Sequence, residues 1–305
     1  MEQGFKIAQV VCHLPPVPGG IGMAEHSYVD QMTERGYDIT VFVPRTKQNV
    51  AEGKSYKVVQ LVPWFKIGLG AFMPQLIWRL WSFQIVHWHY QMIGSTFVIC
   101  LLKWLRKEKM KLVVTYHMDI NLSGWRKLYQ TVFQKFTLFC LLKRADKIIV
   151  SSADYIENSV IQHYYFSNIK KFEEIPFGVP RFYHPMEKDK SLMDKYGFGA
   201  DDKIIIFVGG LDIAHYFKGI NYLIKAISLL DDSKIKALIV GEGNLRCNYE
   251  KLTEELGLSE RIKFTGYIDK QLIVQYYNLG DALVLPSINS SEAFEIGRAS
   301  CRERV

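Results

Sequence analysis

The stretch KIAQVVCHLPPVPGGIGMAEHSYVDQMTERGYDITVFV, from Lys6 to Val43, decides the fold class. It begins with an apolar, β-branched run at 6–12 and ends with a second one at 38–43. Between the two runs, Ala24, Tyr28 and Met32 recur at helical spacing, and Gly36 is a typical helix stop. The order strand, glycine-rich turn, helix, strand predicts a βαβ unit with parallel strands.

The same alternation continues along the chain. Further strands are predicted at 56–62, 83–89, 111–117 and 146–152, and a helix at 95–111. Residues 174–203 hold three prolines and several charges, and are expected to form a linker. The alternation then resumes with strands at 203–210, 235–243, 261–266 and 281–286. The sequence therefore predicts two Rossmann-like α/β domains with parallel sheets facing across a cleft, at 1–178 and 200–294, joined by a linker at 179–199. The second domain is expected to be incomplete, because it stops after its fourth strand.

The composition is that of a globular protein of two domains, with 305 residues, 49% hydrophobic and 23% charged. The five cysteines are odd in number and lack CxxC spacing, which argues against a disulfide framework and a zinc site. No signal peptide is evident at the N-terminus, and the longest apolar run breaks at Lys103, too early to span a bilayer. We therefore expect a cytoplasmic protein, whose net charge of +7 suits anionic partners.

Three glycine-containing turns follow predicted strands and are candidate anion sites. Such turns bring the backbone close to a ligand, and the helix that follows directs its first N–H groups at the same place. The candidates are Gly19, Gly20 and Gly22 in the first turn, Gly209 and Gly210 in the second, and Gly241, Glu242 and Gly243 in the third. Lys218 and Gly219 precede a helix, where a lysine reaches a diphosphate as a point charge. For each glycine turn taken alone, the alternative is an ordinary βα turn that binds no ligand. For Lys218 taken alone, the alternative is a solvated surface lysine.

The first turn does not fit an NAD site. It is not GxGxxG, and the second strand ends in VFVPR without the acidic residue that binds an NAD ribose.

His87 and His89 lie two apart on one strand and therefore face one side of it, and His117 ends the next strand. We expect these histidines to line a ligand site at the strand ends, with a buried structural role as the alternative. A metal site would need a further ligand, which the sequence does not show nearby, and no Asp-x-Asp pair is present.

Taken in order, these pieces resemble the retaining GT-B glycosyltransferases of family GT4, from Lys6 to Phe294. PGGIG with RGYDITVFVP, IVHWH, TYHMD and RADKIIVSS are similar to landmarks of the family's N-terminal domain. IPFGVPRFYHP resembles its domain junction, IPNGVDxxxFxP, and FVGGLDIAHYFKG resembles FVGRLxxxKG. GYIDKQLIVQYYNLGDALVLPS is similar to the stretch before its donor site. Each fragment is weak alone, and the combination is specific.

The resemblance implies transfer of a sugar from a nucleotide-sugar, UDP- or GDP-linked, to an acceptor hydroxyl, with retention and without a required metal or cofactor. The acceptor would be lipid-linked or a saccharide, in cell-envelope polysaccharide or glycolipid synthesis. By the same resemblance Lys218 binds the donor diphosphate, Gly20 approaches the phosphate or acceptor, and His117 touches the transferred sugar. Glu242 and Tyr267 would lie near the nucleotide, and His87 and His89 on the acceptor side.

Two positions depart from the family pattern. Gly210 stands where a phosphate-binding Arg is usual, so either another cation serves, for which His215 is the candidate, or donor binding is weaker. Pro180 stands where the domain junction usually has Asp.

The C-terminal stretch SEAFEIGRASCRERV resembles the family's donor motif only in part. Glu292 corresponds to the sugar-contacting Glu, followed by Ala293 and Phe294. The second Glu of the motif, which holds the ribose, would fall at 300, where Ser300 stands, and Glu295 stands where Gly is expected. Residues 295–305 resemble a translated sequencing adapter. The two resemblances together imply a non-native tail, a truncated second domain and an inactive chain, with a genuine divergent tail as the alternative.

LLKWLRKEKMK and GWRKLYQTVFQKFTLFCLLKR mix basic residues with Trp, Phe and Leu. Such a surface predicts peripheral association with the anionic inner face of a membrane, with a buried helix and a solvated basic face as the alternative. A non-catalytic Rossmann-pair protein that binds a nucleotide and a GT-B epimerase are the alternative functions. Nucleic acid is not an expected partner, because basic residues interleaved with aromatics on a sheet are not evident.

Overall fold

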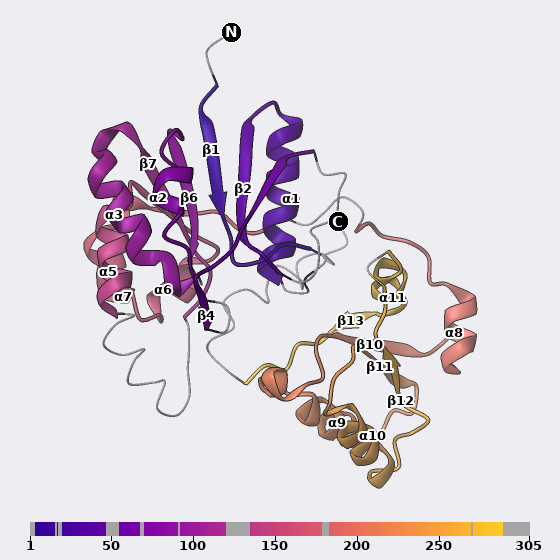
Figure 1. Ribbon diagram of the computed structural model, residues 1–305. Helices are drawn as coiled ribbons and strands as arrows, with labels where there is room; N and C mark the ends of the chain where they lie inside the picture. Colours follow the sequence, from indigo (N-terminus) through magenta and orange to yellow (C-terminus); the bar gives the residue numbers. More distant parts are fainter. Residues whose placement is uncertain are drawn as a thin grey trace. The chain divides into compact units, whose positions relative to one another are not determined.

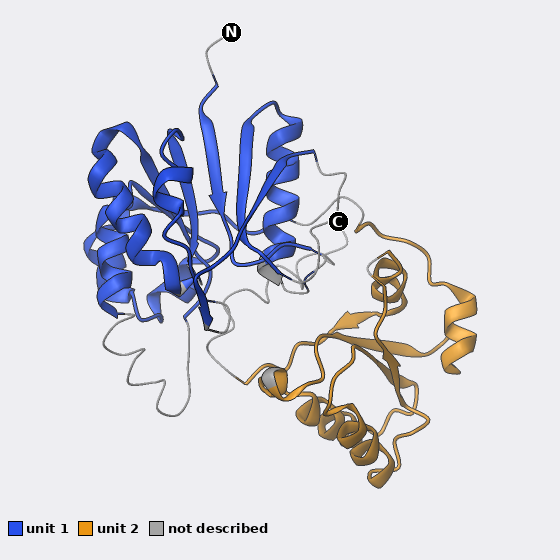
Figure 2. Cartoon of the chain, in the orientation of Figure 1, with its two compact units in different colours: residues 1–178 blue, residues 179–305 orange. Residues whose placement is uncertain are grey.

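The computed structural model describes residues 4–15, 17, 20–46, 55–67, 70–90, 92–119, 135–178, 183–269 and 271–288. The chain divides after Gly178 into two compact units, residues 1–178 and 179–305 (Figure 2). Several residues singled out from the sequence lie outside the described residues: Gly19, Pro180, Glu292, Ala293, Phe294 and the tail 295–305.

Unit 1 is built on a parallel sheet of seven strands in the order β3-β2-β1-β6-β7-β8-β9 (Figure 1). The strands are β1 (Lys6–Val10), β2 (Asp38–Pro44), β3 (Lys57–Leu61), β6 (Ile85–Tyr90), β7 (Lys111–Tyr116), β8 (Lys147–Val150) and β9 (Phe172–Glu174). The described helices of this unit are α1 (Gly20–Glu34), α2 (Leu76–Arg79), α3 (Thr96–Arg106), α5 (Lys135–Arg144), α6 (Ala153–Glu157) and α7 (Gln162–Ser167). A short antiparallel pair, β4 (Phe65–Ile67) and β5 (Gly70–Phe72), completes the described strands of unit 1.

Both faces of this sheet are covered, as a parallel sheet requires. Alternate residues of β1 point to opposite faces, so Ala8 and Val10 pack with α3 and α5, whereas Ile7 packs with Val29 of α1. Gln9 has the same parity as Ile7, which places a polar side chain on the α1 face of an otherwise apolar strand. This face carries the candidate site.

Unit 2 has a parallel sheet of four strands in the order β12-β11-β10-β13 (Figure 1). The strands are β10 (Lys203–Val208), β11 (Ile235–Val240), β12 (Ile262–Gly266) and β13 (Ala282–Leu283). The helices within its described residues are α8 (Lys190–Tyr196), α9 (Ile220–Ser228), α10 (Arg246–Glu255) and α11 (Ile273–Leu279). Two apolar clusters fill the two faces, one with α9 and α10 and the other with α8 and α11. The expected apolar side of α9 is confirmed, since it buries Ile220, Leu223, Ile224 and Ile227.

The second half of the stretch expected to be a linker, 179–199, contains the helix α8. Asp189 caps α8 by accepting hydrogen bonds from the backbone N–H groups of Ser191 and Leu192, and Gly197 ends the helix with φ of +68°. Met193 and Phe198 are buried against Ile204 and Ile206 of β10. The charges and proline of this stretch suggested a linker, but its apolar residues are spaced to cover one face of the second sheet.

Two further findings concern the cysteines and the helices of the described residues. Cys12, Cys100, Cys140 and Cys247, the cysteines among the described residues, are free thiols. No helix in the described ranges is both long enough and apolar enough to cross a membrane.

Candidate active site

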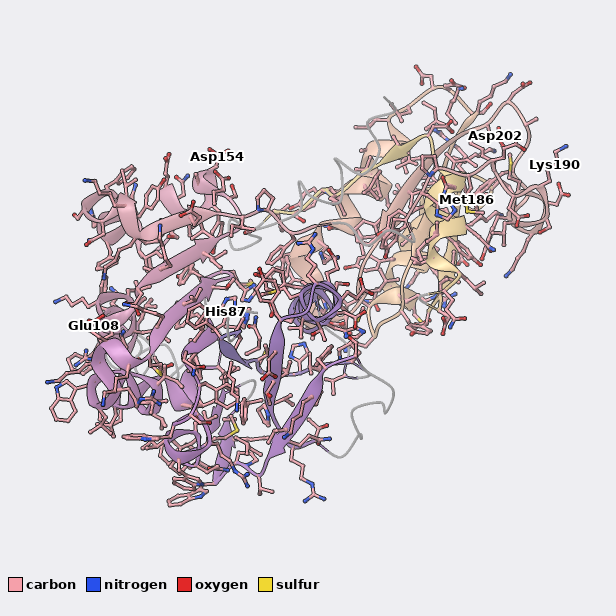
Figure 3. All side chains as sticks on the ribbon, turned by 90° about the horizontal axis from the view of Figure 1, so that it is seen from above. His87, Glu108, Asp154, Met186, Lys190 and Asp202 are labelled. Atoms are coloured by element: carbon pink, nitrogen blue, oxygen red, sulfur yellow. The ribbon has the colours of Figure 1, made fainter. Side chains whose placement is uncertain are left out.

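A cluster of buried polar side chains lies on the α1 face of unit 1, near the carboxyl ends of β1, β6 and β7. Its members are Gln9, Glu25, His87, His89, Thr115 and His117, each 8% exposed or less. From β1 the chain runs to β2 and β3 on one side of the sheet, and the later strands extend from β6 on the other side. The cluster therefore lies at the topological switch point, the usual ligand position of open α/β sheets. His87 is labelled in Figure 3.

Three of these side chains form a continuous hydrogen-bonded chain. Gln9 Oε1 lies 2.8 Å from His89 Nε2, and His89 Nδ1 lies 3.0 Å from His117 Nε2. Glu25 Oε2 lies 2.9 Å from the same His89 Nε2 but is not aligned for a hydrogen bond with it. The ring of His117 stacks on Phe177 at 5.6 Å between centroids, while its Nδ1 has no hydrogen-bond partner among the described residues.

The expectation that His87 and His89 face one side of β6 is confirmed, with their ring centroids 4.2 Å apart. His87 Nε2 lies 2.6 Å from Thr115 Oγ1 on the neighbouring strand β7. His87 therefore has its own partner and stands beside the chain that leads from Gln9 to His117.

Burial keeps the three histidines of this cluster uncharged. It lowers the pKa of His89 and of His117 to about 3, with the neighbouring His89 acting on His117 in the same direction. Burial also lowers the pKa of His87 well below its ordinary value, and raises the pKa of the Glu25 carboxyl. The desolvation cost of a buried charge is the cause in each case.

Gly22, in the first turn of α1, packs closely against His13. A Cβ on Gly22 would lie 2.7 Å from His13 Cδ2 and 2.8 Å from the His13 carbonyl oxygen, so only glycine fits there. Gly20 is the first residue of α1, at its amino end. The glycine at 22 is thus required by contact with the protein's own chain, whereas the α1 amino end is the part of this turn suited to an anion.

Glu25, His89 and His117 are also a candidate metal set, since one ligand atom from each lies within 4.8 Å of the others. The sequence did not suggest this grouping, because Glu25 lies on a helix far from both histidines along the chain. Both ring nitrogens of His89, however, already have partners within the protein, Gln9 and His117. The geometry therefore favours a hydrogen-bonded chain over a metal centre.

In unit 2, the glycine turns after β10 and β11 cross each other in close contact. Gly241 has φ of +152°, and a Cβ there would lie 1.9 Å from the Gly209 carbonyl oxygen. A Cβ on Gly243 would lie 2.2 Å from the Leu211 carbonyl carbon. These glycines hold the two turns together at the carboxyl edge of the sheet, which is a packing role that the sequence reading did not foresee.

Lys218 lies at the same edge, immediately before α9. It is 7% exposed, and its Cδ would lie 3.0 Å from a Cβ on Gly209, so its side chain runs past the first turn. Gly219 has φ of +69°, and a Cβ there would lie 2.0 Å from the Pro286 carbonyl oxygen. Glycine is therefore required beside the lysine, at the point where α9 begins.

His215, the expected substitute for the missing arginine, lies close to an acidic group. Its Nδ1 is 2.9 Å from both carboxylate oxygens of Asp212, and a Cβ on Gly210 would lie 2.8 Å from the same nitrogen. A carboxylate at this distance offsets the charge of a protonated His215. His215 is thus a weaker candidate for phosphate binding than Lys218.

Glu242 lies at the end of β11 and is half-exposed, beside a cation that sequence reasoning missed. Arg246 Nη1 lies 2.7 Å from Glu242 Oε2, and Arg246 Nε lies 2.7 Å from Glu250 Oε1. The hydrogen bond with Arg246 lowers the pKa of the Glu242 carboxyl. The i, i+4 spacing of Arg246 from Glu242 and from Glu250 is the signal that would have found Arg246. Tyr267, which follows β12, is 75% exposed.

With this geometry in place, comparison with known families is decisive. The model of Glycosyltransferase Family 4 matches residues 18–181, more than half of the chain. The chain belongs to glycosyltransferase family 4. A second model, glycosyl transferases group 1, matches residues 188–296, which places the family pattern on both units.

Individual glycosyltransferases are similar to the chain at lower coverage. D-rhamnosyltransferase WbpZ of Pseudomonas aeruginosa is 30% identical over 60% of this chain and 44% of its own length. Sucrose-phosphate synthase from Thermosynechococcus elongatus covers 96% of this chain and 77% of its own, at 20% identity and a TM-score of 0.67. HepE of Anabaena, solved with UDP and glucose, covers 93% and 74%, at 16% identity and a TM-score of 0.63. The structural likenesses show the GT-B fold. The chain spans less than half the length of the first curated relatives it matches.

Proposed function

We propose that this glycosyltransferase moves a sugar from a nucleotide-sugar to an acceptor hydroxyl with retention, and that Lys218 binds the donor diphosphate. The observation that supports the proposal is the position of Lys218. This lysine is buried beside Gly209, at the contact between the glycine turns that follow β10 and β11. As the bond to the sugar breaks, the departing diphosphate gains negative charge. A lysine and a helix amino end aimed at that charge stabilise the transition state more than the ground state.

Replacing Lys218 tests this directly. Lys218→Met keeps a long side chain but removes the charge, and should weaken binding of UDP or GDP about 10- to 100-fold, the effect of losing one charge-assisted hydrogen bond. Isothermal titration calorimetry of the parent and of Lys218→Met, with UDP and with GDP, measures the change in affinity. Lys225→Met on the exposed side of α9 is the matched control and should bind like the parent. Equal affinity in Lys218→Met, with an unchanged circular dichroism spectrum, would remove Lys218 from the donor site.

The finer assignments remain part of this proposal. We assign His117 to the transferred sugar, His87 and His89 to the acceptor side, and Glu242 to the nucleotide, all by family resemblance. The donor would be UDP- or GDP-linked, in line with HepE, which was solved with UDP. The acceptor would be a saccharide or lipid-linked saccharide of the cell envelope, and no metal is assigned to the reaction.

The donor motif at 292–294 belongs to the same proposal. Glu292 would contact the sugar, as in the family motif. Since Ser300 stands where the family has its ribose-binding Glu, the chain as printed is expected to bind donor weakly and to show no measurable sugar transfer. Turnover measured by release of nucleoside diphosphate, well above a protein-free control, would contradict this expectation.

We also propose that unit 1 rests on an anionic membrane. Trp81, Leu105, Arg106, Lys107, Glu108 and Lys109 line a hollow of about 490 Å³ at the end of α3. Trp81 and Leu105 are 49% and 45% exposed, and the Arg106 guanidinium lies 5.4 Å from the Trp81 ring centroid. Exposed aromatic and apolar side chains beside three cations suit the interface of anionic lipid, where rings insert and cations meet headgroups. Glu108 is labelled in Figure 3.

Co-sedimentation with vesicles tests this surface. The chain should bind vesicles containing phosphatidylserine and should not bind phosphatidylcholine alone, because each cation near the surface contributes about 1 kcal/mol. The double variant Lys107→Glu/Lys109→Glu should abolish binding. Lys225→Glu/Lys251→Glu in unit 2 changes the net charge equally and should bind as the parent does. Equal loss in both double variants would assign the effect to net charge rather than to this surface.

A further inference from the structure

We propose that Gln9 is a positioning residue, which acts through His89 to hold His117 in the tautomer whose Nδ1 is unprotonated. His117 would then accept a hydrogen bond from a ligand hydroxyl. The inference about the ligand rests on the proposed function, whereas the inference about the tautomer rests on the hydrogen-bonded chain alone.

The first step is the proton on His89 Nε2. This nitrogen lies 2.8 Å from Gln9 Oε1 and 2.9 Å from Glu25 Oε2. The amide oxygen of Gln9 is an acceptor, so the His89 nitrogen that is hydrogen-bonded to it carries the proton and donates. Reversing the Gln9 amide would leave the buried Oε1 in the place of Nε2, which has no partner.

The position of the proton on His89 determines which nitrogen of His117 is protonated. A neutral imidazole carries one N–H, and burial keeps His89 neutral by lowering its pKa to about 3. With the proton on Nε2, His89 Nδ1 is an acceptor. It lies 3.0 Å from His117 Nε2, so His117 Nε2 must be the donor of that hydrogen bond.

The tautomer of His117 determines the state of its second ring nitrogen, Nδ1. Since burial also keeps His117 neutral, its Nδ1 is left as an unprotonated acceptor. His117 is 4% exposed, its Nδ1 has no hydrogen-bond partner among the described residues, and stacking on Phe177 holds the plane of the ring. A buried acceptor without a partner costs free energy, and a ligand that brings an O–H group recovers it. A ligand with only acceptor atoms at this point is disfavoured.

Nitrogen NMR of the chain labelled with ¹⁵N-histidine at pH 7 tests the tautomer. Long-range ¹H–¹⁵N correlations, assigned by loss of signals in His117→Gln, should show His117 protonated at Nε2 and unprotonated at Nδ1. Gln9→Met should give a mixture of both tautomers, because Glu25 is not aligned to hold the His89 proton alone. Protonation at Nδ1 in the parent, or an unchanged His117 in Gln9→Met, would overturn the proposal.

Thr115→Val is the matched control. It also removes one buried hydrogen bond, the one to His87, but lies outside the chain from Gln9 to His117, so the His117 tautomer should not change. A tautomer change in Thr115→Val as well would mean that any disturbance of the cluster suffices, which overturns a specific role of Gln9. If Gln9→Met does not fold, Glu25→Gln is the second variant. It keeps an acceptor oxygen beside His89 and leaves Gln9 in place, so a lost tautomer there would also count against the proposal.

Two further measurements on the same sample separate the alternatives. Spectra before and after addition of Zn²⁺ should agree, and a shift confined to His89 and His117 would show a metal site instead. Addition of UDP, followed by ³¹P NMR, tests the proposed function independently. The expected tautomer without UDP binding would uphold the role of Gln9 and count against nucleotide binding, and UDP binding with the opposite tautomer would do the reverse.

Discussion

Unit 1 is expected to lose about 1–2 kcal/mol of stability when the pH falls from 6.5 to 5.5, through its buried histidines. His87, His89 and His117 have lowered pKa values in the folded protein, with burial as the main cause. Near pH 6.5 the histidines of the unfolded chain therefore bind protons that the same histidines in the folded chain do not bind. Each histidine contributes stability that is fully present above pH 6.5 and is lost as the pH falls toward the folded pKa.

One group in the cluster acts in the opposite direction. The pKa of Glu25 is raised by burial, so protonation of this carboxyl favours the folded state as the pH falls. That returns at most about 1.4 kcal/mol per pH unit, against about 1 kcal/mol lost from each of three histidines over this interval. His13, whose pKa burial also lowers, adds to the loss. The net effect is destabilisation by acid.

Urea unfolding at pH 7.5, 6.5 and 5.5 measures this loss. All six tryptophans lie between Trp64 and Trp125, within unit 1, so tryptophan fluorescence reports the unfolding of this unit alone. His117→Gln should reduce the pH-dependent loss by about 1 kcal/mol. His163→Gln, on the exposed surface of α7, is the control and should match the parent. Stability that is constant or rises from pH 6.5 to 5.5 would show that the histidines are accessible to protons in the folded state.

Gly241→Ala is expected to destabilise unit 2 by at least about 3 kcal/mol, because two independent costs add. With φ of +152° the backbone adopts a conformation that side chains rarely allow. The new Cβ would also lie 1.9 Å from the Gly209 carbonyl oxygen, and this neighbour is backbone that a rotamer change cannot move. The two turns would have to separate, which would open the carboxyl edge of β10 and β11.

Gly257→Ala is the matched control for the backbone cost alone. Its φ is +68°, and nothing lies within 4 Å of the new Cβ, so a loss of about 1–2 kcal/mol is expected. Hydrogen–deuterium exchange of peptides from 203–241 should show strong loss of protection in Gly241→Ala and little change in Gly257→Ala. Tryptophan fluorescence of unit 1 should be unaffected in both. Similar exchange in the two variants would show that the turns separate freely, and would remove the packing argument.

The elements that follow hydrophobic period were predictable from the sequence, and the contacts that build the site were not. The strands at 6–12 and 203–210 and the apolar side of α9 follow directly from periodicity. Glu25 on its helix has no local signal that it will meet His89, since that contact depends on which strands become neighbours. Gln9 did leave a signal, a polar residue inside an apolar strand.

The glycine turns show the same division. Their positions at strand ends were readable as motifs, but the reason for Gly241 and Gly243 is contact with the chain at 209–211, which only the fold reveals. His215 was chosen as a cation from its residue type, whereas Asp212 lies 2.9 Å from its ring nitrogen. The contact of His215 with Asp212 is local, at i, i+3, whereas the contacts of Gly241 and Gly243 join segments about 30 residues apart and depend on the fold.

The most direct test of the account is a binding panel on the chain as printed. Isothermal titration with UDP-glucose and GDP-glucose, and with NAD and a single-stranded oligonucleotide as comparators, distinguishes a sugar-nucleotide site from other anion sites. We predict binding of one sugar nucleotide that Lys218→Met weakens about 10-fold or more, with weaker or no binding of NAD and the oligonucleotide. Equal binding of all four ligands, or binding that Lys218→Met leaves unchanged, would contradict the proposed donor site.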